Sequence, residues 1–180
     1  NAADESEASS FLQMANCTNY GTRVDITAAN TGCSSRAVSI VAGVAGLVSS
    51  AAMGADGIEP LDPPLSAAET YQILLRSADD VHIAESYGDG ADPTFWPMRP
   101  GWDAFSGHGR VNARSAVDMV LDREIPPEVD ILSPPWFVTY DPELDDTVEV
   151  VGSMAARRAG SYSWAMEVAG GFEPAEDEWI

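Results

Sequence analysis

The chain has 180 residues, of which 29 are acidic and nine are basic, and its formal net charge at neutral pH is −20. A charge balance this acidic argues against binding to nucleic-acid phosphates and against docking on an anionic membrane. Apolar residues make up 45% of the chain, which is enough to build a buried core. The length accommodates one domain and a piece of a second.

All nine basic residues are arginines, and the chain has no lysine. One interpretation is a biased genome composition. The other is a secreted or salt-adapted protein, whose acidic surface stays hydrated and soluble. Composition does not separate the two, and both stay open.

The chain begins with Asn1 rather than Met and stops at Ile180, within sequence typical of a β-strand. We therefore expect both ends to be cut, either by processing or because the gene was sequenced incompletely. The two cysteines, Cys17 and Cys33, could form a disulfide in an oxidising compartment or could be two small buried thiols.

The first part of the chain predicts a loop, a strand and an apolar helix. Residues 1–14 are rich in Ser, Ala and acidic residues, which favours a solvated loop. Residues 23–27 alternate polar and apolar side chains as a strand does, and a turn follows at 28–33. From Ser34 the apolar residues are too dense for one stripe, so we expect a helix buried on most sides. Its apolar run, 38–53, falls short of the roughly 20 residues that a membrane span needs, so no span is predicted.

Two further helices follow. The sequence S-A-A-E at 66–69 is a capping box, and the apolar positions up to Ala78 fit one helical face. A long loop at 79–107 carries several Gly and Pro residues. Asn112 then caps a third helix whose apolar face includes Val120.

Pro126 and Pro127 mark a boundary, and the sequence beyond them changes character. We therefore predict two domains, at 1–125 and 126–180. The second contains three runs that alternate polar and apolar residues as strands do: 129–132, 147–151 and 161–168.

These runs predict the start of a small antiparallel β-domain. Trp136, Phe137 and Trp164 are its expected core residues. Three strands need not complete such a domain, so we expect open strand edges and marginal stability for this chain alone.

A serine pair at the start of the apolar helix is the candidate for chemistry. A serine hydroxyl is a poor nucleophile at neutral pH and needs a base to accept its proton and donors to hold the oxyanion. Free backbone N–H groups and the dipole at a helix N-terminus favour the developing negative charge. Ser34 and Ser35 stand at such a position. Serine is also an ordinary N-cap residue, so the position alone does not indicate catalysis.

The stretch 33–43 reads C-S-S-R-A-V-S-I-V-A-G and resembles the nucleophile motif of the subtilisin-like serine proteases, G-T-S-x-A-x-P-x-V-A-G. The shared Ala and the final V-A-G place Ser35 on the nucleophile, whereas choosing Ser34 breaks both anchors. Three positions depart from the motif: Cys33 replaces Gly, Ser34 replaces Thr and Ser39 replaces Pro.

Three other segments resemble family segments in the family's order. Residues 19–28 resemble the strand that leads to the nucleophile, 65–78 resemble the helix L-S-x-x-E-V/I-x-x-x-L, and 107–113 resemble the closing G-x-G-x-V-N-A. The resemblance implies that 1–125 is the C-terminal portion of an α/β, three-layer, parallel-sheet domain. Beyond it, 126–180 weakly resembles part of an immunoglobulin-like or fibronectin-like all-β sandwich.

The resemblance also implies a function. The intact parent would be a serine-type endopeptidase that cleaves protein or peptide substrates through an acyl-enzyme, with Ser35 as its catalytic residue. The family's motifs for the triad Asp and His are absent from the chain, and the oxyanion-hole Asn lies upstream in the family. We therefore expect the 180-residue chain to be inactive alone. Family habit and acidity imply an extracellular location.

The chain's two histidines, His82 and His108, lack the family's sequence context and are interpreted as structural. The alternative function is a catalytically inactive subtilisin-like scaffold or a secreted binding module. The substitutions at Cys33 and Ser39, both at the nucleophile turn, motivate this alternative.

Two features of the loop 79–107 stay open. Subtilisin-like proteases often bind calcium, and the loop could offer oxygen ligands, although its spacing does not match an EF-hand and solvated turns would need the same residues. These acidic residues are Asp79, Asp80, Asp89 and Asp92. The loop's aromatic residues could line a peptide-binding surface or cover the core. They are Phe95, Trp96, Trp102 and Phe105.

Overall fold

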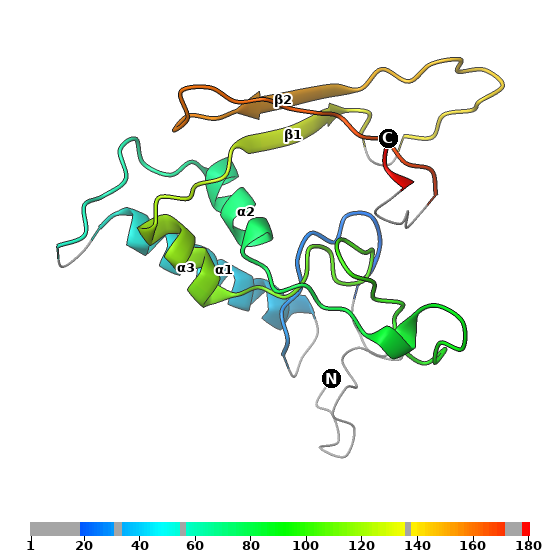
Figure 1. Cartoon of the computed structure of the whole chain (residues 1–180), viewed down its shortest axis with the longest axis horizontal. Helices are drawn as coiled ribbons and strands as arrows, with labels where there is room; N and C mark the ends of the chain where they lie inside the picture. The colour runs from blue at the N-terminus through cyan, green and yellow to red at the C-terminus, as the bar shows by residue number, and fades with distance from the viewer. Residues whose placement is uncertain (1–18, 31–33, 55–56, 136–137, 172–177) are drawn as a thin grey trace.

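The computed structural model describes three main helices and one β-hairpin. In chain order the elements are α1 (Ser34–Ala52), α2 (Ala67–Arg76), the 3-10 helix η2 (Ala84–Ser86), α3 (Ala113–Leu121), β1 (Glu128–Ser133) and β2 (Val151–Ala155). Figure 1 shows α1 and α3 side by side, with α2 between them and the β1–β2 hairpin. The described residues are 19–30, 34–54, 57–135, 138–171 and 178–180.

We call residues up to 125 the helical unit and those from 126 onward the β unit. The predicted helix starts are confirmed. Ser66 Oγ accepts a hydrogen bond from Glu69 N at 2.9 Å, and Ser66 N donates to Glu69 Oε2 at 3.0 Å, which completes the capping box of α2. Asn112 Oδ1 accepts from Ser115 N at 3.0 Å and caps α3.

The apolar core lies where the three helices meet. Burying one aliphatic side chain of this kind stabilises the fold by about 1.5–3 kcal/mol. Ile73 and Val48 have no exposed surface, and Val120 has 2%. The full buried cluster comprises Val44, Val48, Ala52, Leu61, Ile73, Leu74, Ala116 and Val120.

The burial of α1 differs from the sequence prediction. Val44, Val48 and Ala52, which recur every fourth residue, are buried along one face. Val38 and Leu47, on other faces, are 66% and 54% exposed. The prediction of a helix buried on most sides is therefore wrong, because α2 and α3 cover one face of α1 and no other described element covers the rest.

The bounds of the same helix agree with the prediction of a helix from Ser34 to the loop at Gly54. It has 19 residues and a mean hydropathy of 1.4, which is enough by length and composition to cross a membrane. The core helix of a soluble protein passes the same test, so one such helix does not identify a span.

The segment before α1 pairs with the segment before α3. Thr27 N donates to Gly109 O and Val111 N donates to Thr27 O, both at 2.9 Å, in a parallel β-bridge. Asp79 forms an antiparallel bridge on the other side of Arg110, with N···O distances of 2.8 and 2.7 Å. These bonds place the predicted 23–27 strand beside the closing G-x-G-x-V-N-A segment.

Two glycines allow this close approach. Gly107 and Gly109 have φ angles of +65° and +115°, which L side chains rarely adopt. A Cβ at Gly107 would lie 2.5 Å from the Asp25 carbonyl, and one at Gly109 would lie against the Asp79 carbonyl. The backbone therefore requires glycine at both positions.

In the β unit, β1 and β2 pair antiparallel, as predicted, with Glu128 opposite Ala155 and a register shift between Ile131 and Ser133. The other two predicted strands differ. Residues 147–150 precede β2 and 161–168 follow it, both outside regular strands.

The predicted β core also differs from the structure. Trp164 is 65% exposed, because a two-stranded hairpin has no second sheet against which to pack. The prediction that Trp164 is a core residue is therefore wrong. Trp136 and Phe137 lie outside the described residues.

We expect Gly109→Ala to lower the free energy of unfolding by about 2–3 kcal/mol, because it adds a backbone clash to an unfavourable φ. Gly43→Ala in α1 is the matched control: its Cβ would meet nothing within 4 Å, and the better helix propensity should stabilise the chain by about 0.5–1 kcal/mol. Urea denaturation of both variants measures the two changes. Equal changes in the free energy of unfolding of the two variants would contradict the requirement for glycine at position 109.

Candidate functional site

Ser35 lies in the first turn of α1, and its side chain is exposed. Its carbonyl oxygen accepts a hydrogen bond from Ser39 Oγ at 3.0 Å. No hydrogen bond reaches Ser35 Oγ from the described part of the chain. The N-terminal end of the helix offers backbone N–H groups without intrahelical partners. Chemically, this end of α1 can present a hydroxyl beside donors for an anion, and none of the described residues hydrogen bonds to Ser35 Oγ as a base would.

The two histidines lie away from this chemistry. His82 Nδ1 is 3.5 Å from Asp80 Oδ2, and its side chain is half exposed. His108 N donates to Asp25 O at 2.9 Å. Partial burial and the positive charge of Arg76 lower the pKa of His108, while the Asp25 carboxylate opposes them. Neither ring hydrogen bonds to Ser35, in line with the structural role expected from the sequence.

The acidic loop residues are engaged in turns rather than gathered around a cation. Asp79 accepts from Asn112 Nδ2 at 2.8 Å and from Arg110 Nη2 at 2.9 Å, and these bonds lower its pKa. Asp92 accepts from the Thr94 backbone and hydroxyl. Within the described ranges, no three His, Cys, Asp or Glu side chains could hold a metal ion.

The loop's aromatic residues pack against the segment before α1. Trp96 is 6% exposed, and its ring centroid lies 4.9 Å from Phe105 and 5.1 Å from Tyr20. Phe95 and Trp102 are half-buried. Stacked rings at these distances add stability beyond the area that they bury. Trp96, Phe105 and Tyr20 thus form a small aromatic cluster separate from the apolar core of the three helices.

A buried ion-pair network joins the helical unit to the β unit. The Glu69 side chain is 2% exposed. It accepts from Arg158 Nε at 2.9 Å and Nη2 at 3.0 Å, a bidentate arrangement, and from Arg157 Nη1 at 3.4 Å. Arg158 Nη2 also donates to Pro63 O at 2.8 Å. Ser66 Oγ donates to Glu128 Oε1 at 2.5 Å and so connects the α2 cap to the start of β1.

The environment sets the charge of Glu69. Burial acts to raise its pKa, but the hydrogen bonds from Arg158 and Ser66, with the charges of both arginines, outweigh burial and hold the pKa below its ordinary value. Glu69 is therefore ionised at neutral pH. A buried carboxylate with this many donors is satisfied rather than poised for proton transfer.

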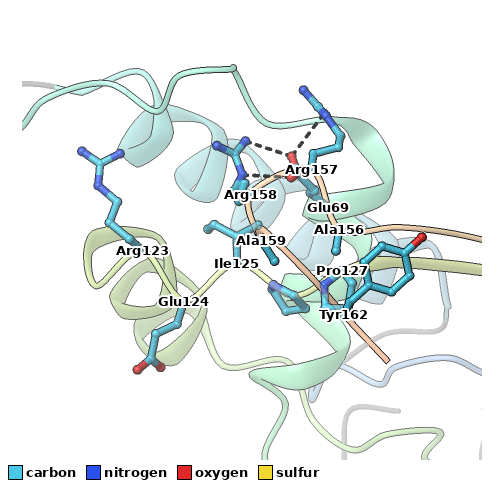
Figure 2. A pocket seen from close by; sticks show the side chains of 11 residues that line it. Glu69, Arg123, Glu124, Ile125, Pro127, Ala156, Arg157, Arg158, Ala159 and Tyr162 are labelled. Carbon is cyan, nitrogen blue, oxygen red and sulfur yellow. Dashed lines mark hydrogen bonds and ion pairs between the residues drawn. The ribbon is translucent and has the colours of Figure 1, made fainter. Parts of the chain in front are cut away.

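A cavity of about 260 Å³ lies beside this network. Figure 2 shows the Arg157 and Arg158 guanidinium groups directed at Glu69, while Arg123 and Glu124 point away. Ile125, Pro126, Pro127, Ala156, Ala159 and Tyr162 complete the lining. Glu69 is paired with Arg157 and Arg158, and the lining residues come from both units, so the cavity lies between the helical unit and the β unit.

The S-A-A-E pattern predicts Glu69 only as a capping residue, and its second role in the ion-pair network has one signal in the sequence. Arg157 and Arg158 are the only basic residues after Arg123, and they are adjacent in an otherwise acidic segment. Adjacent cations in such a segment indicate a specific anionic partner, although the partner itself could not be named. The other candidate pair, Cys17 and Cys33, lies outside the described residues.

The chain is 32% identical over 114 residues to a cell wall-associated protease of Bacillus subtilis. The alignment covers 57% of this chain and 13% of that protease, so the chain spans a small part of the relative's length. No family model matches the sequence, and no solved structure matches it. The similarity relates the chain to a protease.

We expect Arg158→Met to lower the free energy of unfolding by about 3 kcal/mol, because it leaves the buried Glu69 charge poorly compensated. Arg114→Met is the matched control: that arginine is 90% exposed and pairs with Asp118 on the surface of α3, so its loss should change stability by less than about 0.5 kcal/mol. Urea denaturation at neutral pH measures both. A similar loss in both variants would contradict a special role for the buried pair.

The lowered pKa of Glu69 predicts an acid-sensitive contribution to stability. This contribution is fully present above the ordinary carboxyl pKa of about 4.3 and is lost as the pH falls through the lower pKa of the folded state. Glu69→Gln should therefore be less stable than the parent chain at pH 7, and the gap should close at strongly acidic pH. A gap that stays constant across this range would contradict the ionised state of Glu69.

Proposed function

We propose that this chain is part of a subtilisin-like serine endopeptidase in which Ser35 is the nucleophile. The observation that carries the proposal is the position of Ser35 in the first turn of α1, in the register set by the V-A-G at residues 41–43. The similarity to a Bacillus protease over 114 residues supports the reaction class.

The arrangement of the neighbouring segments also supports the proposal. Residues 25–27 lie parallel to 109–111, so the strand-like segment before the nucleophile helix and the closing segment are adjacent. We interpret this parallel pair as one edge of a three-layer α/β domain spanning 1–125, with 126–180 as part of an accessory β-sandwich. The three-layer fold and the domain boundary between residues 125 and 126 are proposals, as the function is.

In this proposal Ser35 Oγ attacks the scissile carbonyl carbon. Its proton passes to a histidine upstream in the parent protein, and the C–N bond breaks as that histidine protonates the leaving amine. Water then hydrolyses the acyl-enzyme. The Ser35 backbone N–H would be one oxyanion donor, at the positive end of the α1 dipole. The second donor and the base-orienting aspartate would also come from upstream.

The substrates would be proteins or peptides outside the cell. The acidic composition is compatible with secretion, and the Bacillus relative is described as cell wall-associated. A catalytically inactive scaffold or secreted binding module is the second candidate. Two departures from the nucleophile motif, Cys33 in place of Gly and Ser39 in place of Pro, favour it.

A serine-directed fluorophosphonate probe on the full-length parent separates the two candidates. We expect labelling that Ser35→Ala abolishes and that Ser34→Ala preserves, since Ser34 lies out of register. An unlabelled parent would support the scaffold, and labelling lost only in Ser34→Ala would move the nucleophile by one residue.

The 180-residue chain itself should not hydrolyse peptides above background, because neither His82 nor His108 hydrogen bonds to Ser35 in the described part of the chain and the family's His motif is absent from the sequence. Removing triad members leaves only residual catalysis, on the order of 10³–10⁴-fold above water. A fluorogenic casein assay with the Ser35→Ala variant as control tests this. Hydrolysis that depends on Ser35 in the isolated chain would show that a base lies within it.

A further inference from the structure

The two units of the chain carry equal charges of the same sign. Residues 1–125 contain 17 acidic residues and seven arginines, a net charge of −10. Residues 126–180 contain twelve acidic residues and two arginines, which again gives −10. Like charges repel each other over a distance that the ionic strength sets. The net negative charges of the two units therefore disfavour the contact between the β unit and the helical unit.

Apolar burial does little to hold the β unit in place. No described residue after Val120 belongs to the buried core, and the exposed apolar residues of β1 include Val129 and Ile131 at 53% and 64%. Hydrogen bonds and ion pairs join the two units. Besides the Glu69 network, Gln72 Nε2 donates to Val129 O at 3.3 Å.

Both cations of the β unit are used in the attachment. Arg157 and Arg158 reach Glu69, and Arg157 Nη1 also lies 3.6 Å from Glu128 Oε1. Two arginines and one buried carboxylate thus offset a repulsion between two units of −10 each. The buried pair responds weakly to salt, whereas repulsion between exposed carboxylates falls steeply with salt.

We propose that attachment of the β unit is a salt-dependent latch, closed at high ionic strength and opened by repulsion when salt is withdrawn. The screening length is about 3 Å at 1 M salt and about 30 Å at 10 mM. At high salt only the short-range attraction of the Glu69 network remains. At low salt the repulsion between the two whole units acts as well. The β unit then separates from the helical unit while the apolar core of the helical unit stays folded.

Trypsin cleavage measures the opening directly, because the enzyme cuts after arginine and the chain has no lysine. The bonds after Arg157 and Arg158 lie at the latch, and the bond after Arg114 lies in α3. Cleavage at each bond is followed by mass spectrometry across a KCl series and normalised to the rate of trypsin on a small arginine ester at the same salt.

From 1 M to 10 mM KCl, latch cleavage should rise on the order of tenfold relative to cleavage after Arg114. Sucrose of matched osmolarity, added at 10 mM KCl, should not restore protection. A ratio that stays constant with salt would overturn the proposal. So would a parallel rise at Arg114, because salt would then act on the whole fold rather than on the latch.

A charge variant tests the cause. Glu143→Gln, Asp146→Asn and Glu149→Gln together change the β unit from −10 to −7 and alter three exposed side chains outside the Glu69 network. We expect this triple variant to show a smaller salt dependence of latch cleavage than the parent chain. Thr147→Ser in the same loop is the charge-neutral control and should behave as the parent chain does. An unchanged salt dependence in the triple variant would overturn the electrostatic cause.

Discussion

The bidentate hydrogen bond between Arg158 and the Glu69 carboxylate is the contact on which the arrangement of the two units depends. Glu69 also closes the cap of α2, so one side chain joins a local helix signal to a long-range attachment. No described residue after Val120 belongs to the buried core, so this polar contact contributes to holding the two units together, and interfaces between domains of one chain are commonly polar. The hydrogen bonds from Arg158 and Ser66 and the charges of both arginines outweigh the cost of burying the carboxylate, and burial shields the pair from salt.

The position of Ser35 depends on a different constraint. The helix α1 is fixed along one face by Val44, Val48 and Ala52, and the segment before it is fixed by backbone bonds to residues 109–111. Those bonds need the close approach that Gly107 and Gly109 permit. The proposed nucleophile is thus supported by a segment far downstream in the chain, while the proposed base and second oxyanion donor belong to neither unit.

Local signals predicted the helices well. The S-A-A-E box and Asn112 each satisfy backbone donors within one turn, so the start of α2 and of α3 follows from sequence alone. The register of Ser35 likewise follows from a short motif. The burial of α1 and the core role of Trp164 did not follow, because both depend on which elements cover them. Apolar density in a sequence shows that a surface could be buried, but it does not identify what packs against it.

The sequence by itself determined the helix starts, the strand at β1, the candidate nucleophile and a strongly acidic charge. Each of these is set by residues close together or by composition. Only the tertiary structure decided that Glu69 meets Arg157 and Arg158, that residues 25–27 lie beside 109–111, and that α1 is covered along one face. These contacts join residues that are distant in the chain, and the free energy of a buried charge or a close backbone approach exists only once the fold has brought them together.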